Sequence, residues 1–132
     1  MSDSVQSLEL PGLEVVLDRL EFRTGGPQAP AETPFVFVYF LTIRNNSDRR
    51  VVLLGRKWIV HEPGHGHKVI EGDKIVGETP DLQPGESFSY NSFHLVGGPA
   101  RVEGSFHGLD EHGDRIHVCI PGFDLVVPDE FA

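Results

Sequence analysis

Short apolar runs alternate with turn-forming clusters along the whole chain. The runs are rich in Val, Ile, Leu and Phe, and in several of them polar and apolar side chains alternate at every second position. The clusters combine Gly, Pro, Asn and Asp, and they occur at residues 11–12, 25–27, 45–48, 63–64, 84–85, 97–99, 112–114 and 121–122. Apolar runs punctuated in this way are typical of an all-β domain.

The pattern predicts strands at residues 13–22, 35–44, 51–62, 68–71, 86–94, 100–109 and 115–127. Residues 13–22 also fit an amphipathic helix, and we prefer a strand because consecutive strands usually pair. Alternation places Val52, Leu54, Trp58 and Val60 on the inward side of their strand. We therefore expect an antiparallel β-sandwich of about seven strands, immunoglobulin-like or fibronectin type III-like, with a jelly roll as the alternative. Its expected core contains Trp58, Phe88, Tyr90, Val102 and Phe106.

The run at residues 35–44 is apolar on both faces of the expected strand. Such a strand is either central in a sheet or covered on its outer face by a partner. Phe93, in the expected strand at residues 86–94, adds another large apolar side chain and supports the second case. The expected interaction face, for a protein partner or for a second copy in a homodimer, consists of Phe35, Phe37, Tyr39 and Phe93.

Length and composition suit a single domain over residues 1–132, with an ordered core at about 13–128. The single cysteine, Cys119, excludes an internal disulfide and favours a reducing compartment. The first residues lack the features of a secretory signal, and no apolar run reaches the ~20 residues of a membrane span. We therefore expect a cytoplasmic protein.

The formal net charge is −9. A negative field repels phosphate backbones and anionic lipid, so we expect neither nucleic acid nor membrane as a partner. One local exception is the group Arg49, Arg50, Arg56 and Lys57. We interpret these cations as residues of a solvated strand edge that discourage edge-to-edge pairing.

Five segments of the chain resemble the ApaG family, also called DUF525. Residues 35–48 resemble its aromatic strand and the following Asn-x-Ser-Asp turn, and residues 52–60 resemble its Leu-Leu-x-Arg-x-Trp strand. Residues 76–90, Val-Gly-Glu-Thr-Pro-Asp-Leu-Gln-Pro-Gly-Glu-Ser-Phe-Ser-Tyr, resemble its most specific signature. Residues 104–106 and 118–125 resemble its last two strands. The resemblance covers roughly residues 13–128.

This resemblance implies a fibronectin type III-like sandwich without an established enzymatic activity. Related domains in larger eukaryotic proteins, such as certain F-box proteins, look like protein-interaction modules. The bacterial family is associated with cobalt and magnesium homeostasis, and with neighbours that hydrolyse dinucleoside polyphosphates. A non-catalytic module for protein–protein interaction is therefore the first expectation for this chain.

The family often carries a Gly-x-Gly-x-x-Gly segment, which suggests a pyrophosphate or dinucleotide site. In this chain the segment reads Gly72-Asp-Lys-Ile-Val-Gly77, so Lys74 replaces the middle glycine. A phosphate loop needs small residues and a helix N-terminus behind them, and no helix is expected here. Gly72, Lys74 and Gly77 remain candidate ligand-binding residues, with a turn that uses glycines at positive φ as the alternative.

Histidines supply the candidate metal ligands. His61, His65 and His67 lie in one expected hairpin, where imidazoles suit a divalent ion such as cobalt or nickel. The spacing matches no closed zinc site, and a polar surface loop without metal is the alternative. A second pair, His107 and His117, lies across the last expected hairpin if its turn is centred on residues 111–113.

Catalytic constellations are missing from the sequence, and we do not expect an enzyme. Cys119 lies between Val118 and Ile120, so we expect a buried, inert thiol unless alternation places it on the outer face. No serine lies in a Gly-x-Ser-x-Gly elbow. Two functions therefore remain from the sequence: a protein-interaction module, or a small-ligand or metal-binding protein that uses residues 72–77 or 61–67.

Overall fold

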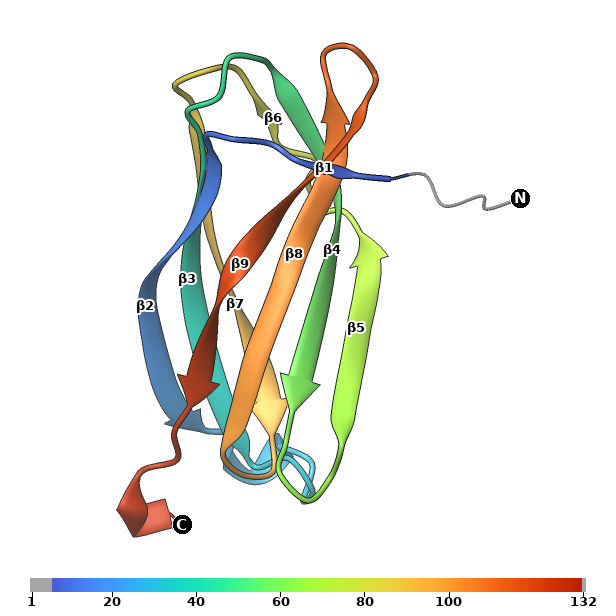
Figure 1. Ribbon diagram of the computed structural model, residues 1–132. Coiled ribbons are helices and arrows are strands. Elements are labelled where there is room, and N and C mark those ends of the chain that lie inside the picture. The colour runs from blue at the N-terminus through green and yellow to red at the C-terminus, as the bar shows by residue number, and fades with distance from the viewer. Residues whose placement is uncertain (1–5, 132) are drawn as a thin grey trace, which may run out of the picture.

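The strands form two layers that pack face to face (Figure 1). The computed structural model describes residues 6–131. The larger sheet has the order β1 (Leu8–Glu9), β9 (Arg115–Leu125), β8 (Ala100–Asp110), β4 (Val51–His61) and β5 (His67–Asp73), and β6 (Asp81–Leu82) also pairs with β4. The smaller sheet has the order β2 (Leu13–Thr24), β3 (Phe35–Asn45) and β7 (Ser87–Val96).

All strand pairs are antiparallel except β1 with β9, which is parallel. Two short 3-10 turns, η1 (Gly26–Gln28) and η2 (Asp129–Phe131), are the only helical segments within residues 6–131. No helix in that range has the length and apolarity required to cross a bilayer. The all-β prediction is confirmed, including a strand in place of the alternative helix at residues 13–22. The prediction of about seven strands missed β1 and β6, which have two residues each.

The core lies between the sheets and is built around Trp58, which is 2% exposed. Its ring centroid lies 4.9 Å from that of Tyr39 and 4.7 Å from that of His94, both on the opposite sheet. Val102 and Phe106 are fully buried, as predicted. Phe88, Tyr90 and Phe35 are partly buried and pack against this core.

One alternation prediction is wrong, in the first half of β4. Val51 and Leu53 are fully buried, whereas Leu54 is 38% exposed and Val52 is half-buried. Leu53 pairs with Gly108 on β8, and the next residue of β8, His107, pairs with Gly55. Leu54 is therefore an extra residue on β4 without a partner on β8. This β-bulge reverses the faces of the strand, because side chains alternate with a period of two.

One edge strand of the larger sheet and one edge strand of the smaller sheet lie on the same side of the sandwich. β5 is one edge of the larger sheet, whose other edge is β1, and β7 is one edge of the smaller sheet, whose other edge is β2. Residues 74–80 connect β5 to β6 beside this open side. The arrangement brings the predicted ligand-binding segment, residues 72–77, next to aromatic side chains of the opposite sheet.

Candidate functional site

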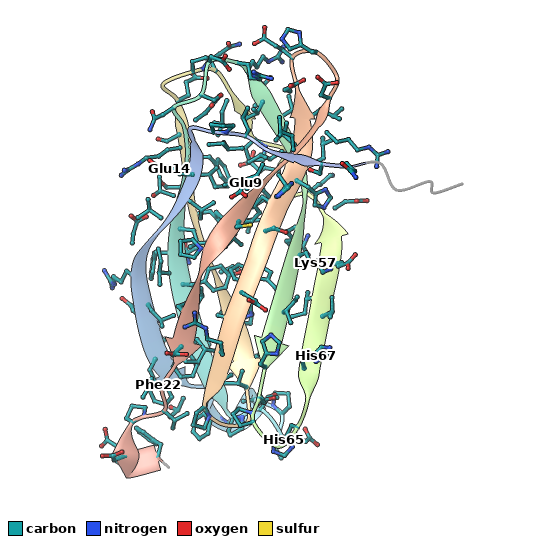
Figure 2. The ribbon with its side chains drawn as sticks, viewed as in Figure 1. Glu9, Glu14, Phe22, Lys57, His65 and His67 are labelled. Atoms are coloured by element: carbon teal, nitrogen blue, oxygen red, sulfur yellow. The ribbon has the colours of Figure 1, made fainter. Side chains whose placement is uncertain are left out.

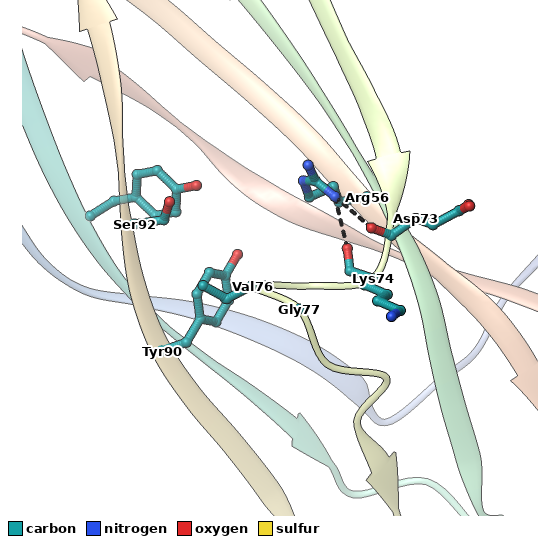
Figure 3. A pocket seen from close by; sticks show the side chains of 8 residues that line it. Arg56, Asp73, Lys74, Val76, Gly77, Tyr90 and Ser92 are labelled. Atoms are coloured by element: carbon teal, nitrogen blue, oxygen red, sulfur yellow. Dashed lines mark hydrogen bonds between the residues drawn. The ribbon is translucent and has the colours of Figure 1, made fainter.

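A cleft of about 230 Å³ opens between the edges of the two sheets (Figure 3). The larger sheet and its following loop contribute a polar wall, and the smaller sheet contributes hydroxyl groups. The lining residues are Tyr39, Arg56, Asp73, Lys74, Val76, Gly77, Tyr90 and Ser92. Lys74 and Gly77, two of the three predicted ligand-binding residues, therefore lie at the cleft.

Arg56 is the principal charge of the cleft. It lies on β4, half-buried, and its Nη1 donates hydrogen bonds to the backbone carbonyls of Asp73 at 2.8 Å and Lys74 at 3.0 Å. Within residues 6–131, no carboxylate forms an ion pair with this guanidinium. Two neutral acceptors therefore orient a cation whose charge is not neutralised by a partner.

Gly72 makes room for this arginine. It is the register partner of Arg56 on β5, and a Cβ atom at Gly72 would lie 2.8 Å from Nη1 and 2.9 Å from Nη2. Such a contact is too short, so any side chain at this position would displace the guanidinium. Gly72 thus supports the cleft without lining it.

The loop after β5 has an unusual backbone. Lys74, Val76 and Gly77 have φ values of 69°, 49° and 79°, in the left-handed region. Ile75, fully buried, holds the loop in place through hydrogen bonds with Glu78 of 2.8 and 3.0 Å. Left-handed backbone is costly for a β-branched residue such as Val76, and conformations of this kind cluster at binding sites.

The wall opposite the loop carries hydroxyl groups. Tyr39 and Ser92 are register partners on β3 and β7, and the buried hydroxyl of Tyr90 has no hydrogen-bond partner within the described part of the chain. Burial raises the pKa of both Tyr39 and Tyr90. Both hydroxyls therefore keep their protons at neutral pH.

Figure 3 shows how these groups are directed. The Arg56 guanidinium and the hydroxyls of Tyr90 and Ser92 face the same hollow, whereas the Asp73 side chain points away from it. The Lys74 side chain also points away from Arg56, so its carbonyl rather than its amine organises the site. Donors that converge beside an unpaired cation are suited to an anion.

The geometry of residues 72–77 differs from that of a dinucleotide loop. No helix begins behind the segment, because β5 is followed by a loop and then by β6. The sequence pattern indicates the segment but assigns Arg56 to a solvated strand edge, whereas the structure places Arg56 at the cleft. The feature that marks Arg56 is its pairing with a glycine on the neighbouring strand. This pairing is known only once the strand register is known, so the sequence alone does not reveal it.

The predicted histidine cluster does not converge. His61 and His67 are register partners with ring centroids 5.5 Å apart, and His61 Nε2 lies 3.1 Å from a carboxylate oxygen of Glu103. His65 lies at the turn between β4 and β5, while His67 lies on β5 (Figure 2). Among residues 6–131, these three imidazoles do not gather their nitrogens within 4.8 Å of one another.

The predicted interaction face is wrong for the residues of β3. Phe37 and Tyr39 are 2% and 4% exposed, and Phe35 packs against the core. Phe93, which is 56% exposed, pairs with Val38 on the opposite face of the sheet. Alternation had separated the two faces of β3 correctly, but it did not decide which of two apolar faces turns inward.

The last hairpin has the predicted register, with His107 opposite His117. The ring of His107 lies over Gly55 on β4, where an added Cβ would be 2.6 Å from its Cε1. Cys119 is exposed, so the expectation of a buried thiol is wrong. Its neighbours Val118 and Ile120 are buried, which leaves the thiol on the outer face by alternation.

Comparisons of the sequence with known proteins identify one family, and a solved structure shares the fold. A family model described as the ApaG domain matches residues 26–109. Protein ApaG of Pectobacterium carotovorum is 37% identical over 100 residues, covering 75% of this chain and 80% of the relative. Protein ApaG of Salmonella arizonae is 37% identical over 102 residues, covering 76% and 81%. A crystal structure of the ApaA protein from Bordetella pertussis shares the fold, with a TM-score of 0.72, 24% identity, and coverage of 92% of this chain and 98% of that one.

Proposed function

The chain belongs to the ApaG domain family, and we propose that it is a non-catalytic module whose cleft binds a phosphoryl group of a small ligand such as pyrophosphate. The observation that carries this proposal is the unpaired guanidinium of Arg56, held toward the cleft by two carbonyls. Binding an anion there supplies the missing countercharge. It also gives the Tyr90 hydroxyl an acceptor.

Arginine suits this ligand because its planar guanidinium presents parallel N–H groups to two phosphate oxygens. Nη1 is engaged by the backbone of β5 and its loop, which leaves other N–H groups for the ligand. The cleft of about 230 Å³ is smaller than the ~300–1,000 Å³ of typical drug-sized ligand sites. Its size favours a phosphate or diphosphate group over a complete dinucleotide.

The chemistry of the lining supports binding rather than turnover. A general base functions best with a pKa near the working pH. Burial instead raises the pKa of Tyr39 and Tyr90, so neither hydroxyl is a base at neutral pH. The carboxylate of Asp73 is directed away from the hollow.

Calorimetric titration with sodium pyrophosphate tests the proposal. We expect the wild-type chain to bind one pyrophosphate, and Arg56→Gln to bind it about 10- to 100-fold more weakly, because a charge-assisted hydrogen bond contributes about 1.5–3 kcal/mol. Arg101→Gln is the matched control, since Arg101 pairs with Asp124 and does not line the cleft. Equal affinities of the wild type and Arg56→Gln would refute the assignment.

A second candidate function, protein–protein interaction, is supported by the outer face of the smaller sheet. Phe93 and Leu95 on the edge strand β7 are 56% and 37% exposed, and Val38 lies directly beside Phe93. An exposed apolar face of this kind is a natural surface for association with a second copy. Light scattering of the wild type and Phe93→Lys tests this: a dimer that the lysine abolishes supports the surface, and a monomeric wild type argues against it. The role in cobalt and magnesium homeostasis stays a prediction from the family resemblance.

A further inference from the structure

Three metal-ligating side chains of different chemistry meet on the outer face of the larger sheet. They are Glu9 on β1 and His117 and Cys119 on β9, and their donor atoms all lie within 4.8 Å of one another. Glu9 is the register partner of His117 in the parallel β1–β9 pair. Figure 1 shows β1 next to β9, its neighbour in the sheet, and Figure 2 labels Glu9 beside β9.

The strand geometry explains the convergence. His117 and Cys119 are two residues apart on one strand, so both side chains point to the same face. β1 then adds a carboxylate from the neighbouring position of the sheet. Glu9 and Cys119 are exposed and His117 is half-buried, so an ion can reach all three from solvent.

The donor set favours zinc. Thiolate, imidazole and carboxylate are the three common protein ligands of Zn²⁺, with bond lengths of about 2.0–2.3 Å. Tetrahedral ligands at those lengths are about 3.5 Å apart, so donors within 4.8 Å need only small side-chain rotations to share an ion. Thiolate and carboxylate together neutralise the dication, and the net charge of −9 attracts cations to the molecule.

Ser7 supplies a supporting contact for the histidine. Its Oγ lies 2.8 Å from Nδ1 of His117. A hydrogen bond from one imidazole nitrogen to an outer group is the usual way in which a metal-binding histidine is oriented, and it leaves Nε2 free for the ion. Ser7 and Glu9 both precede β2, so the N-terminal segment contributes a ligand and its support.

We propose that Glu9, His117 and Cys119 form a Zn²⁺ site that clips the N-terminal strand to β9. Three protein ligands leave the fourth tetrahedral position to water. The thiol proton of Cys119 passes to the buffer when the ion binds. β1 pairs with β9 through two residues only, Leu8 and Glu9, so an ion held by both strands strengthens an otherwise short contact.

Titrations with Zn²⁺ and with Co²⁺, as its spectroscopic substitute, test the site. We expect one ion per chain, and a thiolate-to-cobalt charge-transfer band in the near ultraviolet. Cys119→Ser should abolish the band, and Glu9→Gln and His117→Gln should each weaken Zn²⁺ binding at least tenfold. Ser7→Ala should weaken it about tenfold, as expected for a group that orients a ligand. His61→Gln is the control, because His61 lies on the same sheet beside Glu103.

Hydrogen exchange independently measures whether the ion holds β1 against β9. We expect Zn²⁺ to slow amide exchange at residues 8–10 in the wild type and to leave it unchanged in Cys119→Ser. No binding of Zn²⁺ by the wild type would overturn the proposal. Binding that survives in Cys119→Ser and His117→Gln but fails in His61→Gln would also overturn it, because the ion would then belong to the β4–β5 hairpin.

Discussion

His94 should make the fold sensitive to mild acid. Its side chain is 5% exposed on β7, where the ring stacks on Tyr39 at 4.8 Å and meets Trp58 edge-on at 4.7 Å. Its Nε2 is buried and has no hydrogen-bond partner in the described part of the chain. Burial, with a smaller contribution from the nearby Lys68, lowers the pKa of His94 from 6.5 to about 4.

The direction and size of the effect follow from this shift. Below pH 6.5 the unfolded chain takes up a proton at His94, whereas the folded chain does not until the pH approaches 4. The free energy of unfolding is therefore unaffected by His94 above pH 6.5 and falls as the pH is lowered to 4. One pKa unit corresponds to about 1.4 kcal/mol, so the loss amounts to about 3 kcal/mol. That is a large part of the ~5–15 kcal/mol by which domains are stable.

Urea unfolding between pH 7 and pH 4 measures this loss. The single tryptophan, Trp58, is buried against His94 and reports unfolding by its fluorescence. His94→Phe is the matched control, because it keeps an aromatic ring and removes the titrating group. We expect the wild type to lose about 3 kcal/mol more than the variant over this range. Parallel pH profiles for the two proteins would refute the reasoning.

Three further predictions concern the backbone. Gly108→Ala should destabilise the chain by about 3 kcal/mol or more in urea unfolding, because the new Cβ would lie 1.9 Å from the carbonyl oxygen of Val52; an unchanged midpoint would contradict this packing. Gly72→Ala should displace the Arg56 guanidinium and weaken pyrophosphate binding about tenfold in calorimetry. Tenfold is the lower limit expected for the loss of a charge-assisted hydrogen bond. Unchanged affinity would show that pyrophosphate binding does not need the guanidinium in this position. Val76→Asn should stabilise the chain by about 1 kcal/mol in thermal unfolding, because asparagine tolerates the left-handed backbone at φ 49°; a lower midpoint would count against strain at this residue.

The sequence located most strands to within a few residues, since turn clusters and alternation are local signals. It failed where a non-local feature intervenes. The extra residue at Leu54 changes the inward face in the middle of β4, and only the register against β8 reveals it. The two-residue strands β1 and β6 are too short to produce a periodic pattern.

The candidate sites show the same division. The segment at residues 72–77 was found because glycines mark unusual backbone, but the role of Arg56 depends on its pairing with Gly72. Likewise, Glu9 and Cys119 lie near opposite ends of the chain, and only the parallel pairing of β1 with β9 brings them together. Side chains gathered by sheet topology cannot be read from spacing along the sequence.

Amide chemical shifts during a titration with pyrophosphate test the central claim most directly. Binding in the Arg56 cleft predicts shifts confined to the cleft walls, at residues 72–77, 90 and 92, which disappear in Arg56→Gln. Amides of residues 72–77 that stay unmoved at millimolar pyrophosphate, or shifts that persist unchanged in Arg56→Gln, would contradict the account.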